Sequence, residues 1–540
     1  MFKKLTAILM ALLLVLSCTA AFAEEPEVKE STIQEKLQMN TKVARITEEP
    51  ITLTVWMDVT NQDALGKLIE KMEDNDIFKL MAEKTGVTLS FIHPPVGEAE
   101  TNFSLMMASR KYADIIIGFD SFYSAGGENA IDEGIILDMA PLAEQYAPNY
   151  MAVMNASDFR RKSMYTDSGK MPYLCCPIYM DEEDVTWGGP IIRKDLLDKL
   201  GMDVPVTFDD WHTFLSRCHN ELGLNRAFSI CSNGITKYNS FSASFGFMAP
   251  NIINGTLDFF VVDDKVCYGP LTEGYKEYVA MMAQWYSEGL IDPDFPSLIS
   301  VDDVFALMSS NDCAATSDHG GILDYYNVLG QATNPDINYI AAPMPVREVG
   351  EQLHVNGSTG KSMVHSTAIS ASCEHPEIAM AYLDQYYTDE GFVYLNYGTE
   401  GKTYNVVDGV PEYTELITNN EQGSMICALS AYALPGNIFG EYVMGRDMSD
   451  STRAMADLWN ANSDSAYMLP QTMTLNTEEK AVYADYFADI KSYTEEMTVK
   501  FIMGQESMDK YDQFVDQLKG LNVEAVLAAY QSAYDRYMSR

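Results

Sequence analysis

Aromatic and acidic side chains stand together at several points where a predicted strand ends. A sugar needs flat apolar faces for its C–H surfaces and carboxylates or amides for its hydroxyl groups, and aromatic residues beside acids supply both. In open α/β sheets, ligands bind beyond the carboxyl ends of strands. This rule, and the Asn396–Tyr404 segment, select the candidate binding residues Trp56, Asp58, Phe119, Asp120, Tyr123, Trp187, Asp318, His319, Tyr397, Glu400 and Tyr404.

Several candidates also have a structural alternative. Trp56 and Phe119 could equally belong to the core, and the three aspartates of the set could cap helices. Trp187 stands just before Gly188-Gly189, which we expect to be flexible. Arg193 could bind an anionic ligand or could be a solvated charge at a helix end.

The chain contains no complete sequence motif for catalysis, nucleotide binding or metal binding. Val355–Ser362 resembles a phosphate loop but has valine where the first glycine is required. His212 and His219 share a helix face but lie about 10.5 Å apart along the axis, too far to bind one ion. Carboxylates are so numerous that a glycosidase-like pair could always be nominated. We therefore expect no enzyme activity, no cofactor and no metal, although a secreted glycan-degrading enzyme stays open as an alternative.

The charge of the chain excludes some partners. Its 78 acidic and 36 basic side chains give a net charge of −42. Such a surface repels phosphate backbones and anionic membranes, so we expect no nucleic acid partner. Direct membrane contact is expected only through a lipid anchor or a membrane protein.

The N-terminus reads as an export signal. Lys3 and Lys4 precede an apolar run, and cleavage after Ala23 would remove residues 1–23 as a signal peptide. Alternatively, an imperfect lipobox would make Cys18 the lipidated first residue. Both routes predict an extracytoplasmic protein. Residues 24–48 are charged and without periodicity, which predicts a flexible tether.

The elements that position the candidates follow an α/β pattern. Strands are predicted at residues 53–56, 87–92 and 113–118, with helices at 64–84 and about 100–110 between them, which demands parallel strands. Thr207, with Asp210 three residues later, predicts a capped helix whose apolar face includes Trp211. A further strong helix is predicted at 274–289 and a strand at 314–316.

The C-terminal third is predicted to be helical. Apolar residues from Val482 to Phe501 recur every three or four positions, and Asn522 is expected to cap a last helix. We interpret both apolar stripes as faces that pack on a lobe. Trp211 and Trp285 also lie on apolar helix faces and are expected in cores.

Five segments of the chain, in register, resemble family 1 extracellular solute-binding proteins of ABC transporters, in the large lipoprotein-type branch that binds oligosaccharides or aldouronates. They are Asn75–Pro95, Gly188–Trp211, Tyr268–Phe295, Asn396–Thr414, and the pair Lys500–Ser507 and Ala533–Met538.

The resemblance implies a two-lobed periplasmic-binding-protein-like fold of type II, with largely parallel mixed sheets, helices around them and a hinge cleft. The expected division places residues 49–170 and about 305–395 in lobe 1, and about 171–304 and 396–540 in lobe 2.

The resemblance also implies a function. A carbohydrate, expected to be an oligosaccharide, would be captured by hinge closure and delivered by a monomer to the permease subunits of an ABC importer. A peptide or another small solute stays open as the ligand. Many relatives carry a calcium-type loop after the helix that begins here at Thr207, but His219–Arg226 holds one carboxylate, so we expect no calcium there.

Overall fold

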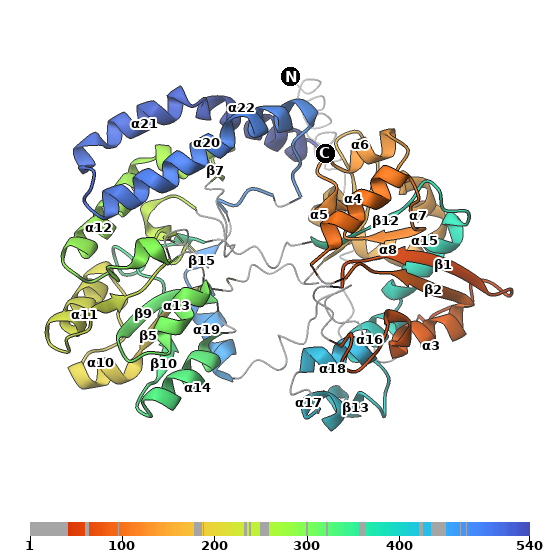
Figure 1. Ribbon diagram of the computed structural model, residues 1–540, viewed down its shortest axis with the longest axis horizontal. Helices are drawn as coiled ribbons and strands as arrows, with labels where there is room; N and C mark the ends of the chain where they lie inside the picture. Colours follow the sequence, from red (N-terminus) through yellow and green to blue (C-terminus); the bar gives the residue numbers. More distant parts are fainter. Residues whose placement is uncertain are drawn as a thin grey trace, which may run out of the picture.

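The computed structural model describes residues 41–540, with gaps. The gaps are residues 60–63, 96, 178–185, 187, 232–234, 237–238, 249–258, 299–300, 320–321, 356–362, 421–424, 434–449, 465 and 471. The predicted signal peptide, Cys18 and Trp187 therefore lie outside the described residues. The chain forms two α/β lobes, on the right and left of Figure 1.

Lobe 1 is built on a five-stranded sheet in the order β2-β1-β3-β12-β4. Its strands are β1 (Ile51–Trp56), β2 (Val87–Ile92), β3 (Ile115–Ile117), β4 (Leu174–Pro177) and β12 (Met363–Ile369). β1 runs parallel to β2 and β3, which confirms the predicted β-α-β-α-β unit. β12 is antiparallel to β3, so the amino-terminal part of β12 lies at the edge where β3 ends.

Helices cover both faces of this sheet. They are α3 (Asp76–Thr85), α4 (Ala99–Ser109), α5 (Phe119–Phe122), α6 (Gly127–Asp132), α7 (Ala140–Tyr146), α8 (Pro148–Met154), α9 (Asp158–Met164), α15 (Pro376–Asp384) and α16 (Asp389–Tyr397). The hairpin of β13 (Tyr404–Val407) and β14 (Val410–Tyr413) follows, with α17 (Glu415–Thr418) and α18 (Met425–Tyr432). The helix expected from residue 64 begins only at Asp76, because the Asn75 side chain accepts a hydrogen bond from the Ile77 N–H and caps α3 there.

Lobe 2 is built on a four-stranded sheet in the order β10-β5-β9-β6. Its strands are β5 (Gly188–Arg193), β6 (Arg226–Phe228), β9 (Cys313–His319) and β10 (Tyr339–Ala341). Its helices are α10 (Lys194–Leu200), α11 (Phe208–Asn220), α12 (Glu273–Ser287), α13 (Val301–Met308), α14 (Leu323–Thr333) and α19 (Asp450–Asn460). Thr207 and Asp210 form the predicted capping box of α11.

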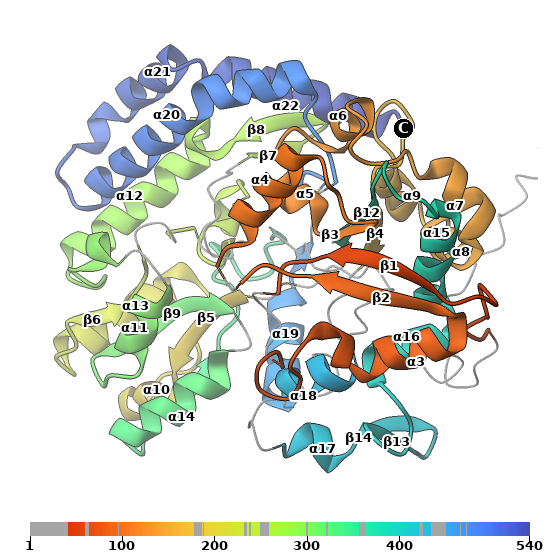
Figure 2. The same ribbon diagram turned by 45° about the vertical axis from the view of Figure 1, so that its right-hand side comes forward.

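The C-terminal helices arch over lobe 2 and reach lobe 1. They are α20 (Thr477–Ile502), α21 (Tyr511–Gly520) and α22 (Val523–Met538), packed beside the hairpin of β7 (Phe259–Val262) and β8 (Lys265–Tyr268). Figure 2 shows the carboxyl end of α22 near α6 of lobe 1. Asn522 precedes α22 but adopts a left-handed conformation, and its side chain makes no cap hydrogen bond, contrary to the expectation. A short parallel pair, β11 (Leu353–His354) with β15 (Ser463–Asp464), completes the strands.

The division between the lobes differs from the expected one. β9 pairs with β5, so residues 301–355 lie with lobe 2, whereas β12 and the helices up to α18 lie with lobe 1. Residues 41–47, expected in the tether, contact lobe 1, where the Val43 N–H donates to Glu390 Oε2 over 2.8 Å. Strand pairing is a long-range property, and no local pattern marks where the chain crosses between sheets.

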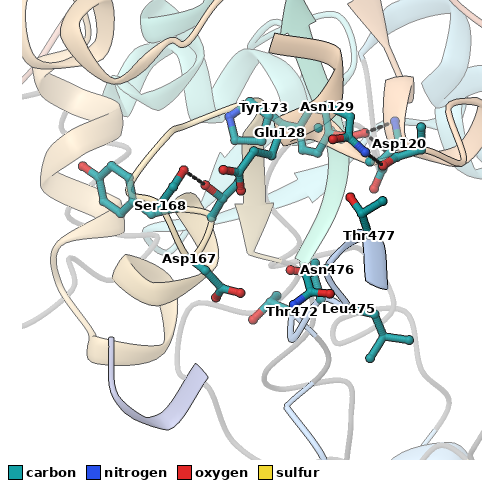
Figure 3. A pocket seen from close by; sticks show the side chains of 18 of the residues that line it. Asp120, Glu128, Asn129, Asp167, Ser168, Tyr173, Thr472, Leu475, Asn476 and Thr477 are labelled. Carbon is teal, nitrogen blue, oxygen red and sulfur yellow. Dashed lines mark hydrogen bonds between the residues drawn. The ribbon is translucent and has the colours of Figure 1, made fainter. Parts of the chain in front are cut away.

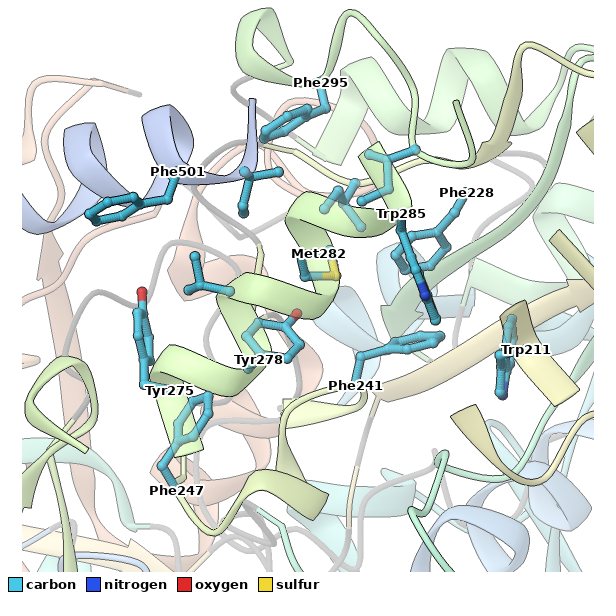
Figure 4. Close-up of a cluster of buried hydrophobic side chains, with 14 of the residues drawn as sticks. Trp211, Phe228, Phe241, Phe247, Tyr275, Tyr278, Met282, Trp285, Phe295 and Phe501 are labelled. Carbon is cyan, nitrogen blue, oxygen red and sulfur yellow. The ribbon is translucent and has the colours of Figure 1, made fainter. Parts of the chain in front are cut away.

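The largest core cluster belongs to lobe 2 and contains both tryptophans that were predicted to be buried. Trp211 contacts Phe241 edge to face, with centroids 4.9 Å apart, and Trp285 packs beside it (Figure 4). Ile490 and Phe501 of the predicted α20 stripe join the same cluster, which confirms that this face packs on a lobe. Among the described helices, none is long and apolar enough to cross a membrane.

Candidate functional site

A cavity of about 660 Å³ lies where lobe 1 faces the start of α20. One wall comes from α5, α6 and the segment from Ser163 to Cys175, and the other from residues 472–480 together with Arg536 of α22. Figure 3 shows Asp120, Glu128 and Tyr173 on one side, and Thr472, Asn476 and Thr477 on the other. Ligand pockets for small molecules typically have roughly 300–1,000 Å³, so the cavity is large enough for a sugar.

Asp120 lies in the lobe 1 wall just beyond the carboxyl end of β3, as the strand-end rule predicts. Its Oδ1 accepts a hydrogen bond from the Ser366 hydroxyl, and its own N–H donates to Ser366 Oγ over 3.1 Å. Ser366 reaches this edge because β12 is antiparallel to β3, with Thr367 opposite Ile117. The Asp120 side chain is exposed and so can accept hydrogen bonds from a ligand.

Tyr173 supplies an aromatic side chain to the same wall. Its ring packs against that of Phe119, with the two ring centroids 6.0 Å apart. Gly127 lies so close that a Cβ there would be 2.5 Å from the Tyr173 hydroxyl. Burial, and then the charge of Asp120, raise the pKa of Tyr173 above its usual value and the pKa of the Cys175 thiol to about 12. Both groups are therefore neutral at physiological pH, and this wall carries its negative charge on carboxylates.

The opposite wall begins at the amino end of α20. Asn476 and Glu479 form a capping box in which each side chain accepts a hydrogen bond from the other residue's N–H. One turn further, the Lys480 ammonium donates to the carbonyls of Ala125 over 3.1 Å and Ser124 over 3.5 Å. This contact joins α20 to the loop before α6, and burial lowers the pKa of Lys480.

Arg536 of α22 forms the second charged link between the lobes. Its Nε lies 2.7 Å from Asp167 Oδ2 of lobe 1, and its guanidinium also binds Glu479 of α20. Burial alone would raise the pKa of Asp167, but hydrogen bonds from Arg536 and Arg540 outweigh it and hold that pKa below its usual value. The Asp167 carboxylate is therefore charged and committed to the two arginines.

Of the candidates predicted from the sequence, Asp120 lines this cavity, and the other described candidates do not. Trp56 and Phe119 are fully buried in one core cluster of lobe 1, as their structural alternative proposed. The Trp56 indole donates to Asn102 Oδ1 over 2.8 Å. Tyr123 is half-buried and its hydroxyl donates to Glu133 Oε2 over 2.9 Å, and Asp58 is half-buried after β1.

The remaining candidates lie elsewhere. Tyr397 and Tyr404 are buried and pack against each other with centroids 5.7 Å apart, while Glu400 between them is exposed. Asp318 is buried at the end of β9, where its carboxylate accepts a 2.6 Å hydrogen bond from the Tyr326 hydroxyl, and His319 beside it is half-buried.

Sequence reasoning missed most of the residues that line the cavity. They include Asn129, Tyr173, Ser366, Thr472, Asn476 and Lys480. Asn476 carried a usable signal, because Asn three residues before Glu predicts a capping box and thus a helix start. Tyr173 and Ser366 gave none, since neither follows a recognisable strand.

Arg226 and Arg193 both form ion pairs with carboxylates of lobe 2. Arg226, at the end of the loop where the family resemblance pointed to calcium, forms ion pairs with Asp292, Asp294 and Asp312 at 3.3, 2.8 and 3.0 Å. Arg193 is buried and pairs with Asp195. Among the described residues, no group of three or more His, Cys, Asp or Glu side chains is placed to hold a metal ion.

Comparisons with known proteins place the fold among binding proteins. No family model matches the chain. A fructooligosaccharide ABC transporter substrate-binding protein, FusA of Streptococcus pneumoniae, is 23% identical over 523 residues, covering 86% of this chain and 87% of that protein. An extracellular solute-binding protein of Bifidobacterium longum subsp. infantis has a TM-score of 0.72 at 17% identity, covering 91% of this chain and 99% of that one.

The alginate-binding protein AlgQ2, in a calcium-free crystal structure, has a TM-score of 0.65 at 21% identity and covers 92% of this chain and 100% of that one. These likenesses extend over nearly the whole described chain. They confirm the resemblance to family 1 extracellular solute-binding proteins: the chain is a homologue of ABC transporter substrate-binding proteins and has their two-lobed α/β fold.

Proposed function

We propose that the protein captures an oligosaccharide between its two lobes, outside the cytoplasm, and delivers it to the permease subunits of an ABC importer. The observation that carries this proposal is the cavity of about 660 Å³ whose walls come from lobe 1 and from the C-terminal helices of lobe 2. The relative that binds fructooligosaccharides supports the ligand class.

The lining suits a sugar. Side-chain hydroxyls and amides of Asn129, Thr472, Asn476 and Thr477 can donate and accept hydrogen bonds, and Asp120 can accept them. The ring of Tyr173 can pack against the C–H face of a pyranose or furanose. A ligand that contacts both walls favours the conformation in which both are close to it, which is how binding drives hinge closure. No bond is made or broken in this function.

Export and anchoring complete the proposal. The N-terminal signal would carry the chain out of the cytoplasm, and Cys18, if it becomes the first residue, would hold it at the membrane by a lipid. Otherwise cleavage after Ala23 would release it. Mass spectrometry of the mature N-terminus distinguishes the two routes.

A ligand screen tests the proposed function. Purified mature protein is expected to gain thermal stability with at least one oligosaccharide, because a ligand that binds only the folded state stabilises it. The same mixtures, analysed by chromatography, should contain the glycan intact. Stabilisation by peptides alone, or turnover of a glycan, would contradict the proposal.

Replacing Tyr173 by alanine is expected to weaken binding of the oligosaccharide found in that screen by about tenfold, which corresponds to about 1.4 kcal/mol. The variant loses the apolar face that packs on the sugar, whereas Tyr173→Phe keeps it and should bind nearly normally. Calorimetric titration measures the affinity.

Tyr325→Ala is the matched control, because Tyr325 is 51% exposed on α14 and does not line the cavity. Unchanged affinity of a folded Tyr173→Ala variant would show that the sugar does not rest on this ring.

A further inference from the structure

We infer that the cavity selects neutral oligosaccharides and rejects uronates, an inference that rests on the proposed function and names its ligand class. Both classes are open from the family resemblance, and one structural neighbour binds alginate, a polyuronate. The charged groups of the cavity wall, and what each is bound to, decide between them.

Arg536 has no donor left for a ligand carboxylate. A guanidinium has five N–H groups. Nε donates to Asp167, one terminal nitrogen to Glu479 and Ser532, and the other to Glu479 and the Thr474 carbonyl. The two carboxylates bound to this guanidinium, those of Asp167 and Glu479, already neutralise its charge, so a uronate would have to displace one of them.

Lys480 is the other cation that lines the cavity, and most of its hydrogen-bond donors already have partners. Two of its three N–H groups point to the carbonyls of Ser124 and Ala125. Its ammonium lies against Gly126, where a Cβ would be 2.5 Å from Nζ. One remaining N–H suits a sugar hydroxyl better than the two oxygens of a carboxylate.

The acidic groups of the lining are less well compensated. Asp120 is bound to the Ser366 hydroxyl, and among the described residues no cation lies within ion-pair distance of it. Asp132 and Glu128 share one lysine, Lys170, with the Glu128 pair at 4.0 Å. A uronate in this cavity would therefore meet uncompensated negative charge, whereas neutral hydroxyls can donate to the same carboxylates.

Direct titration of matched glycans tests the inference. The neutral probes are kestose, maltotriose and xylotriose, and the acidic probes are trigalacturonate and an alginate trisaccharide, each in 20 mM and 500 mM NaCl. We expect a neutral probe to bind with an affinity that salt hardly changes, and every acidic probe to bind at least tenfold more weakly. An acidic probe that binds as tightly as the best neutral one, with affinity falling as salt rises, would overturn the inference.

The outcomes separate this inference from the proposed function. If a uronate binds, the protein still captures glycans and only the selection of neutral ligands fails. If neither class binds, the proposed function itself fails.

A charge variant refines the result. Asp120→Asn should reduce the ratio of neutral to acidic affinities by about threefold or more, because it removes the uncompensated carboxylate. Asp512→Asn is the control with the same change of charge: its carboxylate is 87% exposed on α21, outside the cavity, and its ratio should equal that of the wild type. An equal ratio in both variants would mean that Asp120 does not set the selectivity.

Discussion

Replacing Arg226 by alanine is expected to lower the free energy of unfolding by about 2–3 kcal/mol, measured by urea denaturation at pH 7. Arg226 joins three separate segments of lobe 2: β6, the turn after α12 that contains Asp292 and Asp294, and the turn before β9 that contains Asp312. The Asp292 side chain is fully buried. Without the guanidinium, its charge would stay buried without a counter-ion, which costs more than losing an exposed ion pair.

The effect should depend on pH in a defined direction. Burial raises the pKa of Asp292 above its usual value even with Arg226 present, and removing the cation would raise it further. A carboxyl whose folded-state pKa exceeds its unfolded value binds more protons when folded, so stability from this group rises as pH falls toward that pKa. The loss in free energy of unfolding that Arg226→Ala causes should therefore be smaller at pH 5 than at pH 7.

Arg161→Ala is the matched control. Arg161 pairs with Asp158 at the surface, where the two side chains are 44% and 65% exposed, and such pairs contribute less than about 1 kcal/mol. Equal losses of stability in the two variants would show that the buried aspartate does not determine the cost.

The same cluster predicts that the wild type does not respond to calcium. Arg226 is ion-paired with all three carboxylates, and no group of three or more His, Cys, Asp or Glu side chains in the described part of the chain is placed to hold a metal ion. Millimolar calcium and EDTA should therefore give the same melting temperature. A melting temperature that rises with calcium would contradict this prediction.

The features that sequence predicted well are local or follow from parallel strands. The capping box at Thr207 depends on residues three apart, and it formed as expected. Asp120 was placed at the cavity because β3 is parallel to its neighbour β1, so the rule of strand ends applies. Both are properties of short segments that a sequence displays directly.

The features that sequence could not predict depend on long-range pairing or on which way a side chain points. Ser366 enters the wall from the amino-terminal part of an antiparallel strand, which the strand-end rule does not cover. An aromatic residue at a strand end can point to the core or to the cleft, and Trp56 and Phe119 point to the core. The pairing of β9 with β5, which places the segment from about residue 305 to residue 355 with lobe 2 where lobe 1 was expected, involves strands more than a hundred residues apart.

Gly188 and Gly189, which we expected to form a flexible edge, are instead part of β5 and pair with His319 and Asp318. The reason for glycine at position 189 lies in α19. A Cβ there would lie 2.4 Å from the indole ring of Trp459, whose Nε1 donates to the Ala342 carbonyl over 3.0 Å. Gly189 has no positive φ, so the nearby ring, and not the backbone, excludes a larger residue.

This contact predicts strong coupling between positions 189 and 459. Trp459 is 2% exposed, and Trp459→Ala should cost about 4 kcal/mol because it opens a cavity and leaves the Ala342 carbonyl unpaired. Gly189→Ala should cost about 2 kcal/mol, since a buried indole cannot move aside. In the double variant the new methyl group enters space that the indole has left, so the combined loss should fall short of the sum by at least about 1 kcal/mol.

Urea unfolding followed by circular dichroism measures the free energy of unfolding of the wild type, the two single variants and the double variant. Gly520→Ala serves as the control, because a Cβ there meets nothing within 4 Å. The control should leave stability nearly unchanged and should show no coupling to Trp459→Ala. Additive losses at positions 189 and 459 would mean that β5 shifts to accommodate the methyl group.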